Sequence, residues 1–88
     1  MTFGVIYSVR VKGSAAKELE RLPRDARERL IEAIDRLGAA PLAGSLLKGG
    51  LRGLRRLRVG DYRIVYEALD EELVVLVVRA VHWRQAYR

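Results

Sequence analysis

The residues in this chain whose types and spacing could do chemistry are the arginines between positions 55 and 63. The segment reads R-R-L-R-V-G-D-Y-R, and its central Gly-Asp pair predicts a two-residue hairpin turn of type II′. Strand alternation places Arg56 and Arg58 on one face, and Arg63 follows just beyond the turn. A guanidinium is permanently charged and offers a planar fork to phosphate. We therefore expect the three arginines to form a patch that binds a polyanion; the alternative is a solvated hairpin face.

The C-terminal segment, residues 82–88, reads H-W-R-Q-A-Y-R and mixes aromatic rings with cations. Such a composition is typical of surfaces that bind single-stranded nucleic acid, because bases stack on aromatic faces. The alternative interpretation is that Trp83 fills the core and Tyr87 packs against a sheet edge.

Net charge supports an anionic partner. The 88 residues include 17 Lys and Arg against 11 Asp and Glu, a formal charge of +6, and the excess lies in the C-terminal half. We expect either a nucleic acid or an acidic protein as partner. The basic residues of this half outside the hairpin triad are Lys48, Arg52, Arg55, Arg79, Arg84 and Arg88.

Several kinds of site are excluded by composition. The chain has no cysteine and only one histidine, His82, which argues against disulfides, thiolate zinc sites and paired-histidine metal sites. Motifs for phosphate-binding loops, dinucleotides, serine hydrolases and zinc proteases are absent, so no cofactor is expected. There is neither an apolar run of the ~20 residues that a membrane span needs nor a signal-peptide pattern, so we expect a cytoplasmic protein with no membrane partner.

Hydrophobic periodicity predicts one α+β domain over residues 1–88, in the order β-α-α-β-β-β. Two N-terminal helices pack on a mainly antiparallel four-stranded sheet, because the last three strands are linked by hairpins. Ser14 is the expected N-cap of the first helix, and Gly38 the expected C-cap of the second. The predicted strands are 3–11, 54–59, 62–68 and 73–81, the predicted helices are 14–22 and 24–37, and 39–53 is a loop. The predicted core includes Leu30, Ile34, Leu37, Val65, Val75 and Val77.

The segments that form this pattern resemble the RelE/ParE superfamily of type II toxin–antitoxin toxins. The resemblance covers almost the whole chain: A-A-K-E-L-E-R-L-P (15–23) is similar to the first helix of the family, and L-R-V-G-D-Y-R-I-V-Y-E (57–67) to its most recognisable segment. The ending V-V-R-A-V-H-W-R-Q-A-Y-R is similar to the closing strand and basic, aromatic tail of the family, and the RelE branch is the closer one.

The resemblance implies a RelE-like fold and a ribosome-dependent mRNA endonuclease that inhibits translation. Such a toxin cuts mRNA in the ribosomal A site without metal, by attack of the ribose 2′-OH on the adjacent phosphate. One position departs from the family pattern: Trp83 stands where an arginine usually follows the histidine, and the arginine is displaced to Arg84. The resemblance implies catalytic roles for Arg56, Arg58, Arg63 and Tyr87. We add Arg84, as the substitute for the missing tail arginine, and His82, since either His82 or Tyr87 could be the base. The expected RNA-binding residues are Lys48, Arg52, Arg55, Trp83 and Arg88.

Two other functions remain open within the same family. A member of the ParE branch would inhibit DNA gyrase without cleaving RNA, and a third possibility is a non-toxic module that only binds an antitoxin. The implied partners are an acidic antitoxin that wraps the helices and covers the tail, together with the ribosome and mRNA, or gyrase in the alternative.

Overall fold

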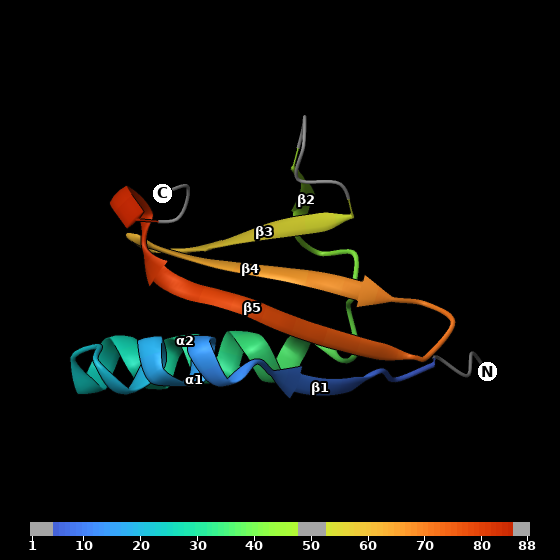
Figure 1. The fold of residues 1–88 in the computed structure, drawn as a ribbon, viewed down its shortest axis with the longest axis horizontal. Helices are drawn as coiled ribbons and strands as arrows, with labels where there is room; N and C mark the ends of the chain where they lie inside the picture. Colours follow the sequence, from blue (N-terminus) through green and yellow to red (C-terminus); the bar gives the residue numbers. More distant parts are fainter. Residues whose placement is uncertain (1–4, 48–52, 86–88) are drawn as a thin grey trace.

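A computed structural model describes residues 5–47 and 53–85 of the chain, which form two helices and a five-stranded sheet (Figure 1). The elements are β1 (Ser8–Val11), α1 (Gly13–Glu20), α2 (Arg24–Leu37), β2 (Ser45–Leu46), β3 (Leu54–Val59), β4 (Tyr62–Leu69), β5 (Val74–His82) and a 3-10 helix, η1 (Trp83–Gln85). The strand order is β1-β5-β4-β3-β2, with β1 parallel to β5 and the other neighbours antiparallel. The predicted α+β class is confirmed.

The number of strands differs from the prediction. Within the segment 39–53, predicted as a loop, Ser45 and Leu46 pair with Arg56 and Arg55 and form a fifth strand. Two residues are too few to show an alternating pattern, so this strand left no periodic signal in the sequence.

The first strand is also shorter than predicted. It covers Ser8–Val11 rather than 3–11, and residues 3 and 4 lie outside the described part of the chain. Ser8 lies opposite Val74, the first residue of β5, so residues before Ser8 have no partner strand to pair with.

The helix boundaries confirm one cap and contradict another. Gly38 is the C-cap of α2, as predicted, and Pro23 is its N-cap. The prediction for Ser14 is wrong: α1 begins one residue earlier, at Gly13, with Lys12 at the N-cap position and no side chain bonded to the free N–H groups. Ser14 therefore lies in the first turn of the helix.

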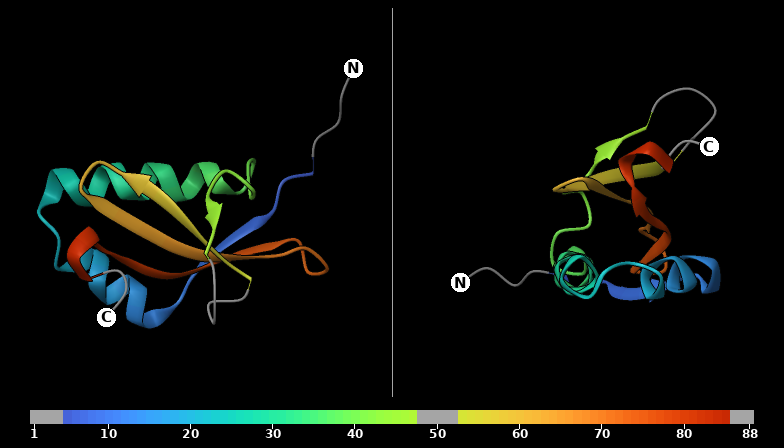
Figure 2. Two further views of the ribbon diagram at one scale, coloured as in Figure 1. Left: turned by 90° about the horizontal axis from the view of Figure 1, so that it is seen from above. Right: turned by 90° about the vertical axis from the view of Figure 1, so that its left-hand side faces the viewer.

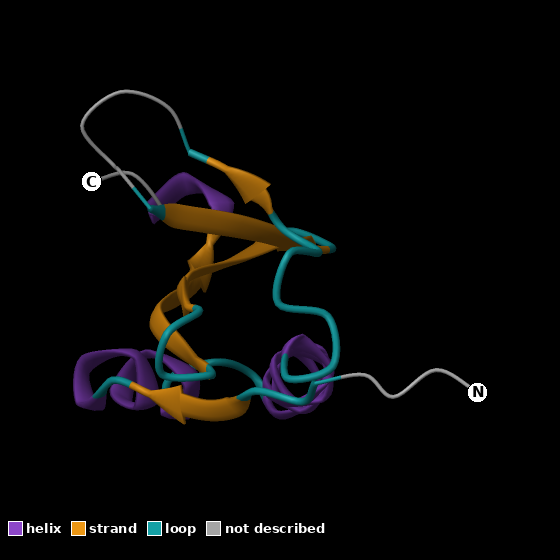
Figure 3. Cartoon of the chain, turned by 90° about the vertical axis from the view of Figure 1, so that its right-hand side faces the viewer, coloured by secondary structure: helices purple, strands orange, loops and turns teal. Residues whose placement is uncertain are grey.

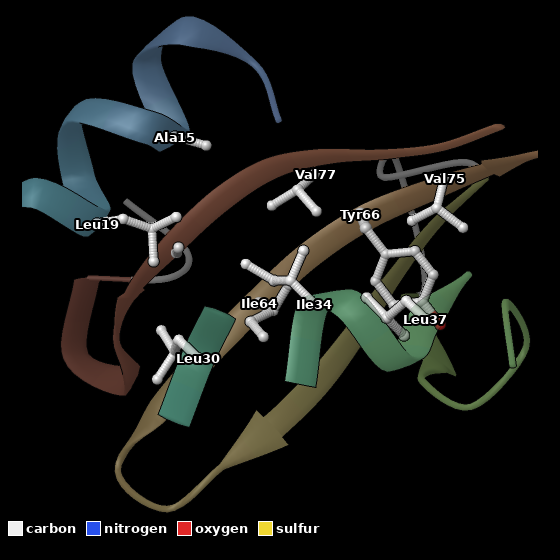
Figure 4. Packing of buried hydrophobic residues seen from close by; sticks show 10 residues of the cluster. Ala15, Leu19, Leu30, Ile34, Leu37, Ile64, Tyr66, Val75 and Val77 are labelled. Atoms are coloured by element: carbon white, nitrogen blue, oxygen red, sulfur yellow. The ribbon is translucent and has the colours of Figure 1, made fainter. Parts of the chain in front are cut away.

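The hydrophobic core lies between α2 and the sheet, and α1 closes it beside β5 (Figures 2 and 4). Leu30, Ile34, Leu37, Val75 and Val77 belong to this cluster, as predicted from the two periodicities. Figure 3 shows the strands bending around α2. None of the described helices is long and apolar enough to span a membrane.

Tyr66 is the largest fully buried side chain of the described residues, and it attaches the loop after α2 to the sheet. Its hydroxyl donates to the carbonyl oxygen of Pro41 and accepts from the N–H of Gly44, both at 2.8 Å. Gly44 has no room for a side chain, since an added Cβ would lie 2.7 Å from the carbonyl oxygen of Arg56. The loop is therefore fixed against β3, the strand that carries the predicted site.

Candidate nucleic-acid interface

Three arginines predicted to share a face do so. On β3, Leu57 and Val59 pack against the core, so Arg56 and Arg58 project from the opposite side of the sheet. On β4, Arg63 lies directly opposite Arg58 in the strand register. We call this side, opposite α2, the arginine face. Cross-strand partners have Cβ atoms about 4.5–5.5 Å apart, so the side chains of Arg58 and Arg63 leave the sheet from neighbouring positions.

The guanidinium groups are not equally exposed. Arg58 is exposed, whereas Arg56 and Arg63 are half-buried. One nitrogen of Arg63, Nη1, donates to the carbonyl oxygens of Tyr62 at 2.9 Å and Gly60 at 3.2 Å. Gly60 has φ of +58°, the conformation that the first position of the predicted type II′ turn requires. In this structure the Arg63 head is thus held at the end of the hairpin, beside the turn.

Buried valines form the floor of the arginine face. Val65 lies between Arg56 and Arg79 in the register of the sheet, and Val81 lies opposite Arg63. Both valines are at most 5% exposed but belong to no part of the α2 cluster. Val65 is therefore a buried core residue, as predicted, although it packs outside the cluster that faces α2. The long apolar run of residues 73–81 indicates this second buried layer, because it places apolar side chains on both faces of the strand.

Arg55 is separated from the other three arginines. It pairs with Tyr66 and so projects to the α2 side, where its Nη1 donates to the carbonyl oxygen of Gly44 at 2.7 Å. This contact fixes β2 and its loop to β3. The structure thus gives Arg55 a structural contact and does not bring it to the arginine face.

The described part of the tail forms a row of rings beside the β3–β4 turn. His82 pairs with Tyr62 and makes an edge-on ring contact with it, at 5.7 Å between centroids. Trp83 is 46% exposed, and its backbone N–H donates to the carbonyl oxygen of Asp61 at 2.8 Å. The Arg84 guanidinium lies 5.5 Å from the indole centroid, within reach of a cation–π interaction. Trp83 is therefore a surface residue, and the interpretation of it as a core residue is wrong.

His82 is placed differently from the arginines. Its register position opposite Tyr62, a residue packed on the core, puts it on the α2 side at the end of β5. Its Nδ1 accepts the backbone N–H of Arg84 at 3.3 Å, and among the described residues its Nε2 has no hydrogen-bond partner. The sequence predicts one site for His82 and the arginines. In the structure, His82 leaves the sheet on the α2 side, whereas the three arginines leave it on the opposite side.

Four predicted site residues, Lys48, Arg52, Tyr87 and Arg88, lie outside the described residues. Sequence reasoning also missed a residue on the arginine face: Arg79, opposite Val65, whose Nη2 forms an ion pair with Glu18 Oε2 at 2.8 Å. Nothing in the strand pattern predicts this partner, because Glu18 is distant in sequence. Within the described ranges, no three acidic or histidine side chains are grouped so as to hold a metal ion.

Comparison with known proteins places this geometry in a family. Residues 9–87 match the family model of the ParE toxin of the type II toxin–antitoxin system parDE. Over 84 residues, 93% of this chain, it is 33% identical to Toxin RelG and 31% identical to Toxin RelE of Mycobacterium tuberculosis, covering 97% and 87% of those proteins. The toxin–antitoxin complex RelBE2 of M. tuberculosis superposes with a TM-score of 0.83 at 34% identity, covering 89% of this chain and 99% of the matched chain. The chain therefore belongs to the RelE/ParE family of type II toxin–antitoxin toxins.

Proposed function

We propose that this toxin is a ribosome-dependent endonuclease that cleaves mRNA in the A site and so inhibits translation. The observation that carries the proposal is the arginine face, where Arg56, Arg58 and Arg63 lie on one side of the β3–β4 hairpin, with the exposed Trp83 bonded through its backbone to the turn of that hairpin. An inhibitor of DNA gyrase that cleaves no RNA has no chemical need for adjacent like charges, which repel each other unless an anionic partner neutralises them.

The proposed reaction is an internal transfer of the phosphodiester. The 2′-oxygen forms a bond to phosphorus, the bond from phosphorus to the 5′-oxygen breaks, and the products are a 2′,3′-cyclic phosphate and a 5′-hydroxyl. A base takes the proton of the 2′-OH, and an acid gives one to the leaving 5′-oxygen. His82 and Tyr87 are the candidates for these proton transfers, because arginine stays protonated at physiological pH.

The remaining residues have binding and electrostatic roles in this proposal. Arg56, Arg58 and Arg63 bind the scissile phosphate and stabilise the charge that develops on its oxygens. Trp83 stacks on a base, and Arg84 substitutes for the usual tail arginine. Lys48, Arg52 and Arg88 add phosphate contacts, whereas Arg55 is left out because its guanidinium already binds the Gly44 carbonyl.

A groove between α2 and β3 supports the proposal of an acidic antitoxin as partner. Its volume is about 530 Å³, and its apolar wall includes Ala33, Leu37, Leu57 and Val59. The charged residues around it are Arg29, Arg36, Arg58 and Glu32, three cations against one anion. An amphipathic acidic segment fits this combination. Because Arg58 also belongs to the arginine face, a segment bound in the groove would reach the proposed RNA site.

The antitoxin proposal is tested by co-expression with the small open reading frame next to the toxin gene. We expect rescue of growth and co-purification, and we expect Ala33→Glu to weaken the complex by placing an anion in the groove wall. Recovery of an equally tight complex from Ala33→Glu would contradict binding in this groove.

Inhibition of DNA gyrase is the second candidate function. It is favoured by Trp83, which stands where the RelE pattern has an arginine, and by the ParE description of the matching family model. Two assays on the purified toxin distinguish the candidates: cleavage of mRNA on translating ribosomes, with the product ends identified, and inhibition of gyrase supercoiling. The nuclease proposal requires 2′,3′-cyclic phosphate ends and unaffected gyrase. Intact mRNA together with blocked supercoiling would instead identify the protein as a gyrase inhibitor.

A further inference from the structure

The short helix η1, which carries Trp83 and Arg84, is held at both ends by other elements. At its start, the backbone N–H of Trp83 donates to the carbonyl oxygen of Asp61, 2.8 Å away in the β3–β4 turn. At its end, the carbonyl oxygen of Gln85 accepts from Nη1 of Arg79 at 3.1 Å. Three residues of 3-10 helix have poor hydrogen-bond geometry of their own. The orientation of η1 therefore depends on these outside contacts (Figure 1).

Arg79 is itself held by a carboxylate of α1. Its Nη2 and Nε donate to Oε2 of Glu18, at 2.8 Å and 3.3 Å. The two side chains are 32% and 21% exposed, compared with 85% and 64% for the ion pair of Arg24 and Glu28 on α2. Solvent and salt screen the Glu18–Arg79 pair less, so its geometry is better defined than that of an ordinary surface pair.

The second oxygen of Glu18 has a structural contact with β5. Strand β1 accompanies β5 only as far as Val77, and beyond this point α1 lies along that edge. The N–H of Ala80, a fully buried residue, donates to Oε1 of Glu18 at 3.1 Å. One carboxylate thus fixes the backbone of β5 and the guanidinium that holds η1.

We infer that Glu18 and Arg79 form a latch that positions η1, and with it Trp83 and Arg84, beside the arginine face. Arg79 lies on that face, opposite Val65, so the latch connects α1 with the surface proposed to bind RNA. Both are positioning residues: they act through η1 and need not touch the substrate. The catalytic part of this inference rests on the proposed nuclease function, whereas the orientation of η1 can be measured without it.

Glu18→Gln separates the two contacts of the latch. The amide keeps an oxygen for the N–H of Ala80 but loses the charge that binds Arg79, so we expect a folded protein with a loosened η1. Arg79→Lys is the second variant: it keeps the charge and loses the planar fork that contacts Glu18 and Gln85 together. Glu28→Gln is the matched control, because it removes the same charge from an exposed ion pair on α2.

The first readout is quenching of Trp83 fluorescence by acrylamide. Trp83 is the sole tryptophan, so the signal reports η1 alone. Since 46% of its surface is already exposed, complete release of η1 can raise the quenching constant by about twofold at most. We expect a clear rise in Glu18→Gln and Arg79→Lys, well below their melting temperatures, and none in Glu28→Gln. Unchanged quenching in folded Glu18→Gln overturns the latch, even if Arg79→Lys does not fold.

The second readout is cleavage on translating ribosomes. We expect kcat/KM to fall by about 10- to 100-fold in the two latch variants, because small misplacements of substrate-binding groups have effects of this size. Full cleavage by a variant with raised Trp83 quenching overturns the positioning role. If the wild type cleaves nothing while quenching changes as expected, the nuclease proposal fails and the latch on η1 is supported.

Discussion

Replacing Tyr66 by phenylalanine tests whether the loop after α2 is attached to the sheet as the structure indicates. The change removes only a hydroxyl, but this group contacts two backbone atoms, the N–H of Gly44 and the carbonyl oxygen of Pro41, both at 2.8 Å. Tyr66 is fully buried, so water cannot replace the lost hydroxyl at the buried Gly44.

The expected loss of stability follows from these two contacts. An unsatisfied buried N–H costs about 1–3 kcal/mol, and the lost bond to the carbonyl oxygen about 0.5–1.5 kcal/mol. Together they predict a destabilisation of roughly 2–4 kcal/mol. Domains of this size have total stabilities on the order of 4–13 kcal/mol. Because 1 kcal/mol corresponds to about 4–8 °C, the melting temperature should fall by roughly 8–32 °C.

Thermal and urea unfolding, followed by circular dichroism, measure this change directly. Tyr62→Phe is the control, because the Tyr62 ring contacts His82 while its hydroxyl bonds to no described residue. We expect Tyr62→Phe to remain within about 0.5 kcal/mol of the wild type. Equal stabilities for the two variants would refute the assignment of Tyr66 as the attachment of the loop.

Further predictions concern a glycine and a tyrosine. Gly44→Ala should destabilise the fold by about 1–3 kcal/mol, because its Cβ would lie 2.7 Å from the Arg56 carbonyl oxygen. Gly13→Ala is the control and should not destabilise the fold, because its Cβ would have no atom within 4 Å. Equal melting temperatures for the two variants would contradict the close packing at Gly44. The hydrogen bond that Tyr7 donates to Asp70, followed by desolvation and the carboxylate charge, raises the pKa of the Tyr7 phenol. Its stabilising effect is present below the usual tyrosine pKa and is lost as the pH rises through the raised value. In Asp70→Asn, absorbance titration should show the Tyr7 phenol ionising at a lower pH than in the wild type. An unchanged titration curve would contradict the contact between Tyr7 and Asp70.

The periodic parts of the chain could be predicted from the sequence. Two patterns each predict an element with one buried face: the amphipathic stripe of residues 24–37 and the alternation on either side of the Gly60 turn. In the structure, the predicted faces are the ones that pack on the core. The two-residue strand β2 could not be predicted, because it is defined by partners nine and eleven residues away along the chain rather than by its own pattern.

The candidate site was predictable to the same degree. The shared face of Arg56 and Arg58 follows from alternation within β3, and Arg63 joins it because the two-residue turn sets the register of β4. The different contacts of Arg55 and Arg79 could not be foreseen, because Gly44 and Glu18 are brought to them by the folding of distant segments. Sequence patterns give the direction of a side chain, whereas its partner depends on tertiary structure.

The rate of mRNA cleavage on programmed ribosomes by Arg63→Ala tests the central claim most directly. Among the residues that the structure describes, Arg63 bonds only backbone carbonyls at an accessible turn, so its loss should change stability by less than about 1 kcal/mol. Removal of one donor to the transition state should lower the single-turnover rate about 10²- to 10³-fold. Arg24→Ala, which removes an equal charge from an exposed position on α2, should cleave at the wild-type rate. If folded Arg63→Ala cleaves as fast as the Arg24→Ala control, the arginine face is not the site of catalysis.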